Sequence, residues 1–251
     1  MLVQRQSVPL HIVGDTNIYI DGLNFYYGAV KGTPFKWFDF EAFSRLLVPL
    51  DTIGKIRYFT ARVKPRHKAD RCHERQNAFL RAIDANPLIE ITEGHFRKDV
   101  RWRALAEEKH ECADLFRPEL LPAEDAKALL VDARSRREDD PWTSARVLIP
   151  EEKGSDVNLA AYLLRDAFKG KCAKAIVVTN DSDLAKPIAF AVQEGIEVGI
   201  VNPHYKNSTN HRLLDVATFE IPLREATLDQ CQLPTPVIGR GGRQIHKPKE
   251  W

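Results

Sequence analysis

The stretch "AIVVTNDSDL", residues 175–184, decides the fold of this chain. Its opening run of apolar and β-branched residues predicts a buried strand. The run stops at Thr179, and Asp181 and Asp183 follow with one serine between them. Aspartates in that place either end the strand and begin a helix, or they hold a positively charged ligand.

The same pattern of a short apolar strand followed by a helix runs along most of the chain. Further strands are predicted at residues 17–20, 55–63, 88–96, 146–154 and 196–201. Helices are predicted at residues 38–50, 66–85, 155–170 and 187–195. Strands that alternate with helices and are apolar throughout favour a parallel arrangement. The sequence therefore predicts an α/β fold, with a mostly parallel sheet and helices on both faces.

Two segments interrupt this alternation. Residues 98–145 are charged and helix-prone, and they predict a helical insertion in a sheet domain that spans residues 1–221. Because the sheet does not require the insertion, we expect it to contact a regulatory protein partner or a second copy in a homo-oligomer. Residues 222–251 carry prolines and the run "GRGGR", and they predict an extended C-terminal arm.

Composition sets limits on the class of protein. Hydrophobic residues make up 43% of the chain, charged residues 29%, and the formal net charge is only +2, which gives no global case for nucleic-acid binding. The four cysteines lie far apart, which suggests neither a zinc site nor a disulfide framework. No apolar run approaches the ~20 residues of a membrane span. We expect a cytoplasmic protein with reduced thiols.

Four acids lie where predicted strands end. Asp21 follows the first strand, Asp181 and Asp183 follow the strand of the opening stretch, and Asp156 lies in the first turn of the helix after another strand. Ligands of open α/β sheets bind beyond the carboxyl ends of the strands, near the point where the strand order reverses. If these strands are neighbours, the four carboxylates converge on one edge of the sheet.

Such convergence favours a bound cation. Two carboxylates about 5 Å apart repel each other by roughly 3 kcal/mol at an effective dielectric constant of about 20. Mg²⁺ or Mn²⁺ would remove this cost, and two such ions can hold the attacking and leaving oxygens of a phosphodiester. Three of the four acids also have an ordinary structural interpretation. Asp21 could begin a turn, Asp156 could stabilise a helix N-terminus, and Asp183 could cap the next helix.

With these residues in view, the chain resembles the NYN family, a branch of the PIN-like nucleases. Three ordered motifs carry the resemblance: "YIDGLNFYYG" (19–28), "PEEKGSDVNLAAYLLRDAF" (150–168) and "VVTNDSDLAKPIAFAVQEGIEVGIV" (177–201). It covers most of the chain apart from roughly residues 98–145. It implies a Rossmann-like or flavodoxin-like sheet and cleavage of RNA by divalent metal ions that aspartates hold.

The resemblance also implies roles for individual residues. Asp21 is the first acid and Asn24 its polar partner in "DGLN"; Asp156 is the acid of "KGSD", and Asp181 and Asp183 are those of "NDSD". All five would be catalytic, and the four aspartates would be the metal ligands.

One residue departs from the family pattern. Asn180 stands where many relatives carry glycine, a mild departure that should leave the carboxylates in place.

Several basic residues could contact the phosphates of RNA, because they lie close to the acids or at the end of a predicted strand. A solvated surface explains them equally well. They are Lys153, Lys186, Arg62, Lys64, Arg66 and Lys68.

The sequence therefore predicts an endonucleolytic ribonuclease that depends on Mg²⁺ or Mn²⁺. The alternative is an RNA-binding or scaffold protein that keeps the fold without significant turnover. A phosphatase of the haloacid dehalogenase type ranks low. That chemistry requires a second acid two residues after Asp21, where this chain has Leu23.

Overall fold

The structure is a computed structural model that describes residues 15–65, 69–104, 130–133 and 144–251. The chain divides into two compact units. The larger unit comprises the residues up to His95 and those from Lys153 onward, and the smaller unit comprises Phe96–Glu152.

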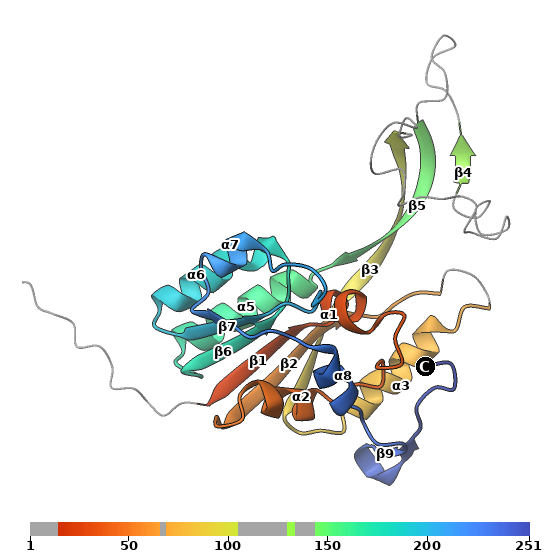
Figure 1. Cartoon of the computed structure of the whole chain (residues 1–251). Coiled ribbons are helices and arrows are strands. Elements are labelled where there is room, and N and C mark those ends of the chain that lie inside the picture. Colours follow the sequence, from red (N-terminus) through yellow and green to blue (C-terminus); the bar gives the residue numbers. More distant parts are fainter. Residues whose placement is uncertain (1–14, 66–68, 105–129, 134–143) are drawn as a thin grey trace, which may run out of the picture. The chain divides into compact units, whose positions relative to one another are not determined.

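Within its described residues, the larger unit contains six strands that pair in parallel, in the order β3-β2-β1-β6-β7-β8 (Figure 1). Their bounds are β1 Thr16–Asp21, β2 Ile53–Ala61, β3 Ile89–Ala104, β6 Lys174–Val178, β7 Glu197–Val201 and β8 Phe219–Glu220. Along the chain, β2 and β3 are added on one side of β1, and β6, β7 and β8 are then added on its other side. The strand order therefore reverses between β1 and β6, as in a Rossmann fold. The predicted α/β fold with a mostly parallel sheet is confirmed.

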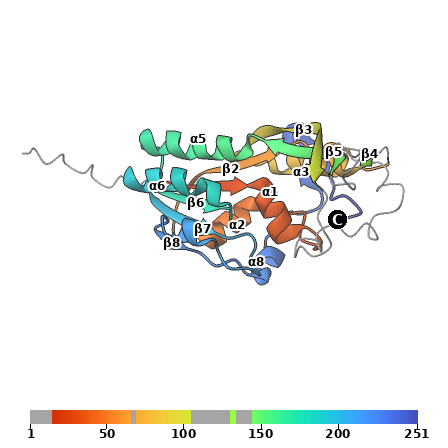
Figure 2. The same cartoon turned by 90° about the horizontal axis from the view of Figure 1, so that it is seen from above.

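Helices cover both faces of this sheet (Figure 2). One face carries α1 Gly22–Phe25, α2 Phe40–Leu47, α3 Cys72–Ile83 and α8 Glu225–Gln230; the other carries α5 Ser155–Phe168, α6 Ala185–Gln193 and α7 His211–Leu214. Each face of the sheet has its own hydrophobic core, and the side chains of β1 point alternately into the two cores. Ile18 and Ile20 pack on the α2 side, and Tyr19 packs on the α5 side. In α5, Leu159 and Leu163 lie four residues apart and form the buried stripe.

The segment 222–251 is part of the larger unit and packs on its core, which corrects the expectation of an extended arm. Leu228 of α8 is fully buried against the α2 face. Trp37 donates its indole N–H to the main chain of this segment (3.0 Å), and its ring lies edge-on to that of Trp251. A short antiparallel hairpin follows α8, formed by β9 Val237–Ile238 and β10 Gln244–Ile245. The apolar residues between the prolines thus complete the aromatic core.

The described residues of the smaller unit are strands. They comprise the C-terminal part of β3, β4 Leu130–Ala133 and β5 Ser144–Lys153, and β4 pairs with β5 in antiparallel orientation. The helices predicted for residues 98–145 are not found in the described part of that segment. The strands were not predicted because the segment is charged and lacks an apolar strand pattern. Pairing of the backbone with a neighbouring strand stabilises them instead, and such pairing leaves no local signal in the sequence. Residues 105–129 and 134–143 lie outside the described residues, and a partner surface there stays a prediction.

Two smaller observations concern membranes and thiols. Among the described residues, no helix is both long enough and apolar enough to cross a membrane. Cys72, Cys172 and Cys231 carry free thiols, and the last two are buried. Cys112 lies outside the described residues.

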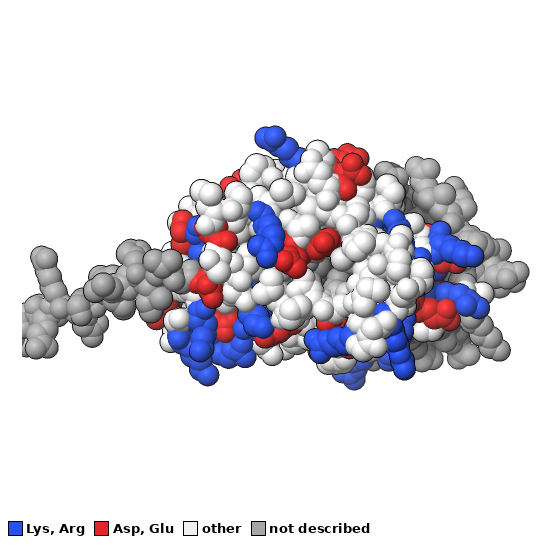
Figure 3. All heavy atoms as spheres, turned by 90° about the horizontal axis from the view of Figure 1, so that it is seen from below, with Lys and Arg blue, Asp and Glu red and all other residues white. Residues whose placement is uncertain are grey.

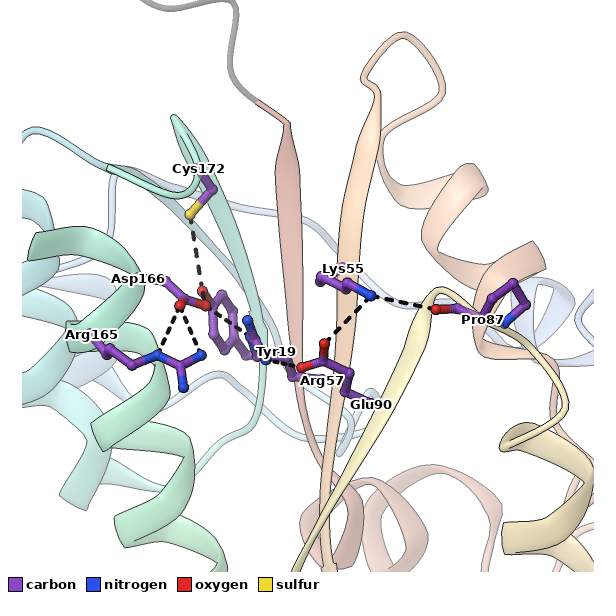
Figure 4. A network of polar contacts seen from close by, with 8 residues as sticks. All are labelled: Tyr19, Lys55, Arg57, Pro87, Glu90, Arg165, Asp166 and Cys172. Carbon is purple, nitrogen blue, oxygen red and sulfur yellow. Dashed lines mark hydrogen bonds and ion pairs between the residues drawn. The ribbon is translucent and has the colours of Figure 1, made fainter. Parts of the chain in front are cut away.

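A buried network of charges joins α5 to the sheet (Figure 4). Arg57 of β2, which is 7% exposed, donates from Nε to Asp166 of α5 at 2.8 Å and from Nη1 to Glu90 of β3. Asp166 is 1% exposed and also accepts the hydroxyl of Tyr19 from β1 at 2.9 Å. One carboxylate therefore connects two central strands to the helix that packs on them.

Replacing Asp166 should destabilise the larger unit. We expect Asp166→Ala to lower the free energy of unfolding by about 3–5 kcal/mol, because the buried Arg57 would lose a carboxylate partner. Urea denaturation measures the change. In the control, Glu74→Gln, the exposed ion pair with Arg71 (3.1 Å) is lost, at a cost below about 1 kcal/mol. Equal, small losses in the two variants would show that the network does not anchor α5.

Candidate functional site

The side chains that follow β1 and β6 meet at the point where the strand order reverses. Asp21, the last residue of β1, is 4% exposed. Its Oδ1 accepts the backbone N–H of Asn24 (3.0 Å), and its Oδ2 accepts the hydroxyl of the buried Thr179 (3.1 Å). The same hydroxyl oxygen accepts the backbone N–H of Asp181 (3.1 Å). Thr179 therefore connects the first and the third sequence motifs.

The acids at this edge interact electrostatically. Burial raises the pKa of Asp21 from 3.8 to about 7. The hydrogen bonds from Asn24 and Thr179 favour the ionised form, whereas the negative charges of Asp156 and Asp181 raise the pKa further. Asp21 is consequently about half protonated near neutral pH.

Asp183 differs from the other three acids. It is exposed, and its backbone N–H donates to Asp181 Oδ1 at 3.0 Å. Asp181, rather than Asp183, thus caps the 3₁₀ helix Ser182–Leu184, and Asp21 caps α1 in the same way. Asp156 lies in the first turn of α5, as predicted. The ordinary capping roles and the shared position at the sheet edge therefore coexist.

The predicted metal site would be formed by the carboxylates at this edge of the sheet. Within the described ranges, no group of three or more His, Cys, Asp or Glu side chains could hold a metal ion. One carboxylate oxygen of Asp21 and one of Asp181 already accept a backbone N–H at the start of a helix. A Mg²⁺ or Mn²⁺ ion at these carboxylates stays a prediction.

Asparagine side chains tie the loop between β7 and α7 to the acids. Asn24 Oδ1 accepts the backbone N–H of Asn180 (3.1 Å), and Asn180 Oδ1 accepts the backbone N–H of Asn210 (2.7 Å). Asn180 Nδ2 also donates to the carbonyl oxygen of Ser208 (3.5 Å). The side chain of Asn180 thus holds this loop in place.

The sequence prediction missed the next part of the site. Asn202, which directly follows β7, accepts the backbone N–H of His204 (2.8 Å) and donates to the carbonyl oxygen of Asn207 (3.0 Å). The His204 ring lies so close to Gly28 that a Cβ atom on Gly28 would come within 2.8 Å of it. The available signal was an asparagine within three residues of the end of each of three strands; Asn24 was assigned a role, Asn180 was noted only as a departure from a motif, and Asn202 was not considered.

The basic residues expected to contact RNA have varied surroundings. Arg62 pairs with Glu93 (2.6 Å), so a carboxylate already neutralises its charge. Lys186 is exposed and lies over the ring of Phe190, with its ammonium nitrogen 5.0 Å from the ring centroid. Lys64 and Lys153 are exposed, and Arg66 and Lys68 lie outside the described residues. RNA as a partner stays a prediction.

The polar cluster lies at the switch point of a Rossmann-like sheet, which is the place where ligands of such sheets generally bind. The chain matches no family model, so its resemblance to the NYN family stays a prediction. It is 30% identical to 6-hydroxy-3-succinoylpyridine 3-monooxygenase HspA of Pseudomonas putida over 260 residues, which cover 94% of this chain and 75% of that protein. The chain belongs to the family of this monooxygenase.

A solved structure is also similar. It is a protein of unknown function from Vibrio parahaemolyticus, with a TM-score of 0.46 and 14% identity, and the match covers 88% of this chain and 96% of that one. A likeness this remote carries no argument about function.

The family relationship overturns the predicted activity. The related enzyme is named as a monooxygenase, which is an oxidoreductase and not a hydrolase of phosphodiesters. The prediction of a metal-dependent ribonuclease, and with it the alternative of an RNA-binding protein without turnover, is wrong. Carboxylates after parallel strands mark the edge where a ligand binds, but they do not determine which reaction occurs there.

The raised pKa of Asp21 should make the free energy of unfolding depend on pH. The folded state binds a proton more tightly than the unfolded state does, so stability falls as pH rises from about 4 to 7. Asp21→Asn removes this effect. Between pH 5 and pH 8 the variant should gain about 3 kcal/mol relative to the wild type, as measured by urea denaturation at both pH values.

The control for this experiment is Asp229→Asn, which removes an exposed carboxylate of α8. Its stability should follow that of the wild type across the same pH range. If Asp21→Asn and the wild type also run in parallel, Asp21 has an ordinary pKa and the electrostatic description of the site fails.

The tether formed by Asn180 makes a separate prediction. Asn180→Ala should release the loop at residues 202–210, because the Asn210 amide loses its acceptor. We expect faster hydrogen exchange at the Asn210 amide and a loss of about 1–2 kcal/mol in stability. Asn207→Ala is the matched control, since Asn207 contributes its backbone carbonyl to the loop. Unchanged exchange at Asn210 in Asn180→Ala would contradict the tether.

Proposed function

We propose that the protein is a monooxygenase that acts on a small hydroxylated pyridine carrying an acidic side chain. The observation that carries the proposal is the 30% identity to the Pseudomonas putida enzyme over 94% of this chain. The relative's name places the new oxygen at ring carbon 3, which carries the succinoyl group. One oxygen atom of O₂ would bond to that carbon, the bond from the ring to the side chain would break, the side chain would leave as an aldehyde and the other oxygen atom as water, which together consume four electrons and four protons. The electrons come from an organic donor of the nicotinamide or flavin class.

The switch point between β1 and β6 is the candidate site for this reaction. Ligands of Rossmann-like sheets bind at this place, and the side chains there are polar and largely held by hydrogen bonds. Asn24 and Thr179 fix the carboxylate of Asp21, and the loop that Asn180 tethers forms part of the surroundings. A preorganised set of polar groups of this kind can orient a small substrate.

Asp21 is the group we assign to proton transfer. A hydroxypyridine becomes more electron-rich when it loses its hydroxyl proton, and an electron-rich ring reacts more readily with an electrophilic oxygen species. A general base works best when its pKa lies near the working pH. Asp21 is buried, hydrogen-bonded and has a pKa of about 7, so it can take up that proton near neutral pH.

The test uses 6-hydroxy-3-succinoylpyridine as substrate, with NADH or NADPH, with and without FAD or FMN, under ¹⁸O₂. The proposal expects oxidation of the donor that depends on the substrate, and mass spectrometry should find a ring product with one ¹⁸O atom. Absence of both signals under every donor condition would overturn the proposed function.

The role of Asp21 is tested separately. Asp21→Asn should lower kcat/KM by at least about 100-fold, and the wild-type kcat/KM should fall as the pH drops below about 7, because protonated Asp21 cannot accept a proton. Asp229→Asn should retain the wild-type value. Full activity of Asp21→Asn would remove Asp21 from the mechanism and leave the proposed reaction standing.

A further inference from the structure

A second concave site lies at the opposite edge of the same sheet. A cavity of about 420 Å³ opens beside the first residues of β1 and β2 and the end of α5, whereas the acids of the candidate site follow the last residues of β1 and β6. Five basic side chains line it: Lys55, Arg57, Arg165, Lys169 and Lys171.

The charges around this cavity do not cancel. Asp15 and Asp166 are the carboxylates in its lining, and Glu90 adds a third negative charge through its contacts with Arg57 and Lys55. Five cations against three anions leave a surplus of two positive charges. The C-terminal end of α5 supplies only about half a negative charge, which is too little to balance that surplus.

Two of the cations lack a carboxylate partner. Lys169 and Lys171 are exposed and flank Gly170, whose positive φ of 58° lets the backbone turn after α5. In the part of the chain that the structure describes, neither lysine forms an ion pair. Basic side chains also gather along the lower margin of the face in Figure 3, so the charges are sorted locally although the net charge of the chain is only +2.

The arginines of the cavity are oriented before any ligand arrives. Asp166 and Glu90 hold the guanidinium of Arg57 from two sides (Figure 4). Arg165 donates to Asp166 Oδ1 from Nε and Nη2, at 3.2 and 3.1 Å. Guanidinium groups that are already fixed lose less conformational entropy on binding an anion, and their planar shape matches phosphate and carboxylate groups.

We propose that this cavity binds a small organic anion with at least two negative charges, carried by phosphate or carboxylate groups. Its volume lies in the range of small-molecule sites, about 300–1,000 Å³. Two uncompensated positive charges select a dianion over a neutral or cationic ligand. The proposal concerns a site at the other end of the strands from the one assigned to oxygenation, and it does not depend on that assignment.

Isothermal titration calorimetry of the full chain with pyrophosphate and with citrate tests the proposal. Wild type should bind at least one of these probes, and Lys169→Gln/Lys171→Gln should bind it at least about 10-fold more weakly. Both lysines are exposed, so the fold should tolerate the change. Lys36→Gln/Lys249→Gln removes the same charge outside the cavity and should stay within about twofold of wild type.

The two probes separate the chemical sources of the charge. Preference for pyrophosphate assigns phosphate groups to the natural ligand, and preference for citrate assigns carboxylates. Two results would overturn the proposal: no binding of either probe to the wild type at millimolar concentration, or equal weakening in the two double variants, which would indicate general attraction to a basic surface.

Discussion

The structure depends on a constraint imposed on β1. This strand pairs with a parallel strand on each side, and all six of its residues are buried. Each of its polar side chains must therefore find a partner inside the protein. The hydroxyl of Thr16 donates to Asp51, that of Tyr19 donates to Asp166, and Asp21 accepts the hydroxyl of Thr179. The partners come from the loop before β2, from α5 and from the residue after β6, so satisfying β1 fixes the positions of the elements around it.

Elements with a strong local signal could be predicted from the sequence. The strands around the opening stretch and α5 show apolar runs or helical spacing that survive in the fold, and their order along the chain was enough to predict a parallel α/β sheet. The strands in the described part of the segment 98–145 could not be predicted, because they are defined by pairing between residues that are separated in sequence. Likewise, Leu228 and Trp251 pack against the core although prolines lie near them in the sequence. No local sequence pattern predicts such packing.

The candidate site divides in the same way. Asp21 and Asp181 could be found because each follows a strand, and the structure places both at the reversal of strand order. Asn180 looked like a minor variation in a motif, yet it holds a loop that begins more than 20 residues later. The chemistry itself could not be read from the acids. A carboxylate at the end of a strand can hold a metal ion, cap a helix or accept a proton, and its position alone does not distinguish these uses.

The packing of the segment after residue 222 has a consequence for how the protein is made. The aromatic core on the α2 face is begun by residues 25–83 and completed by Leu223, Leu228 and Ile245. A ribosome adds about 5–20 residues per second, so the early aromatic residues wait roughly 7–30 seconds for the chain that covers them. During that interval the nascent protein presents an open apolar surface of the kind that chaperones bind.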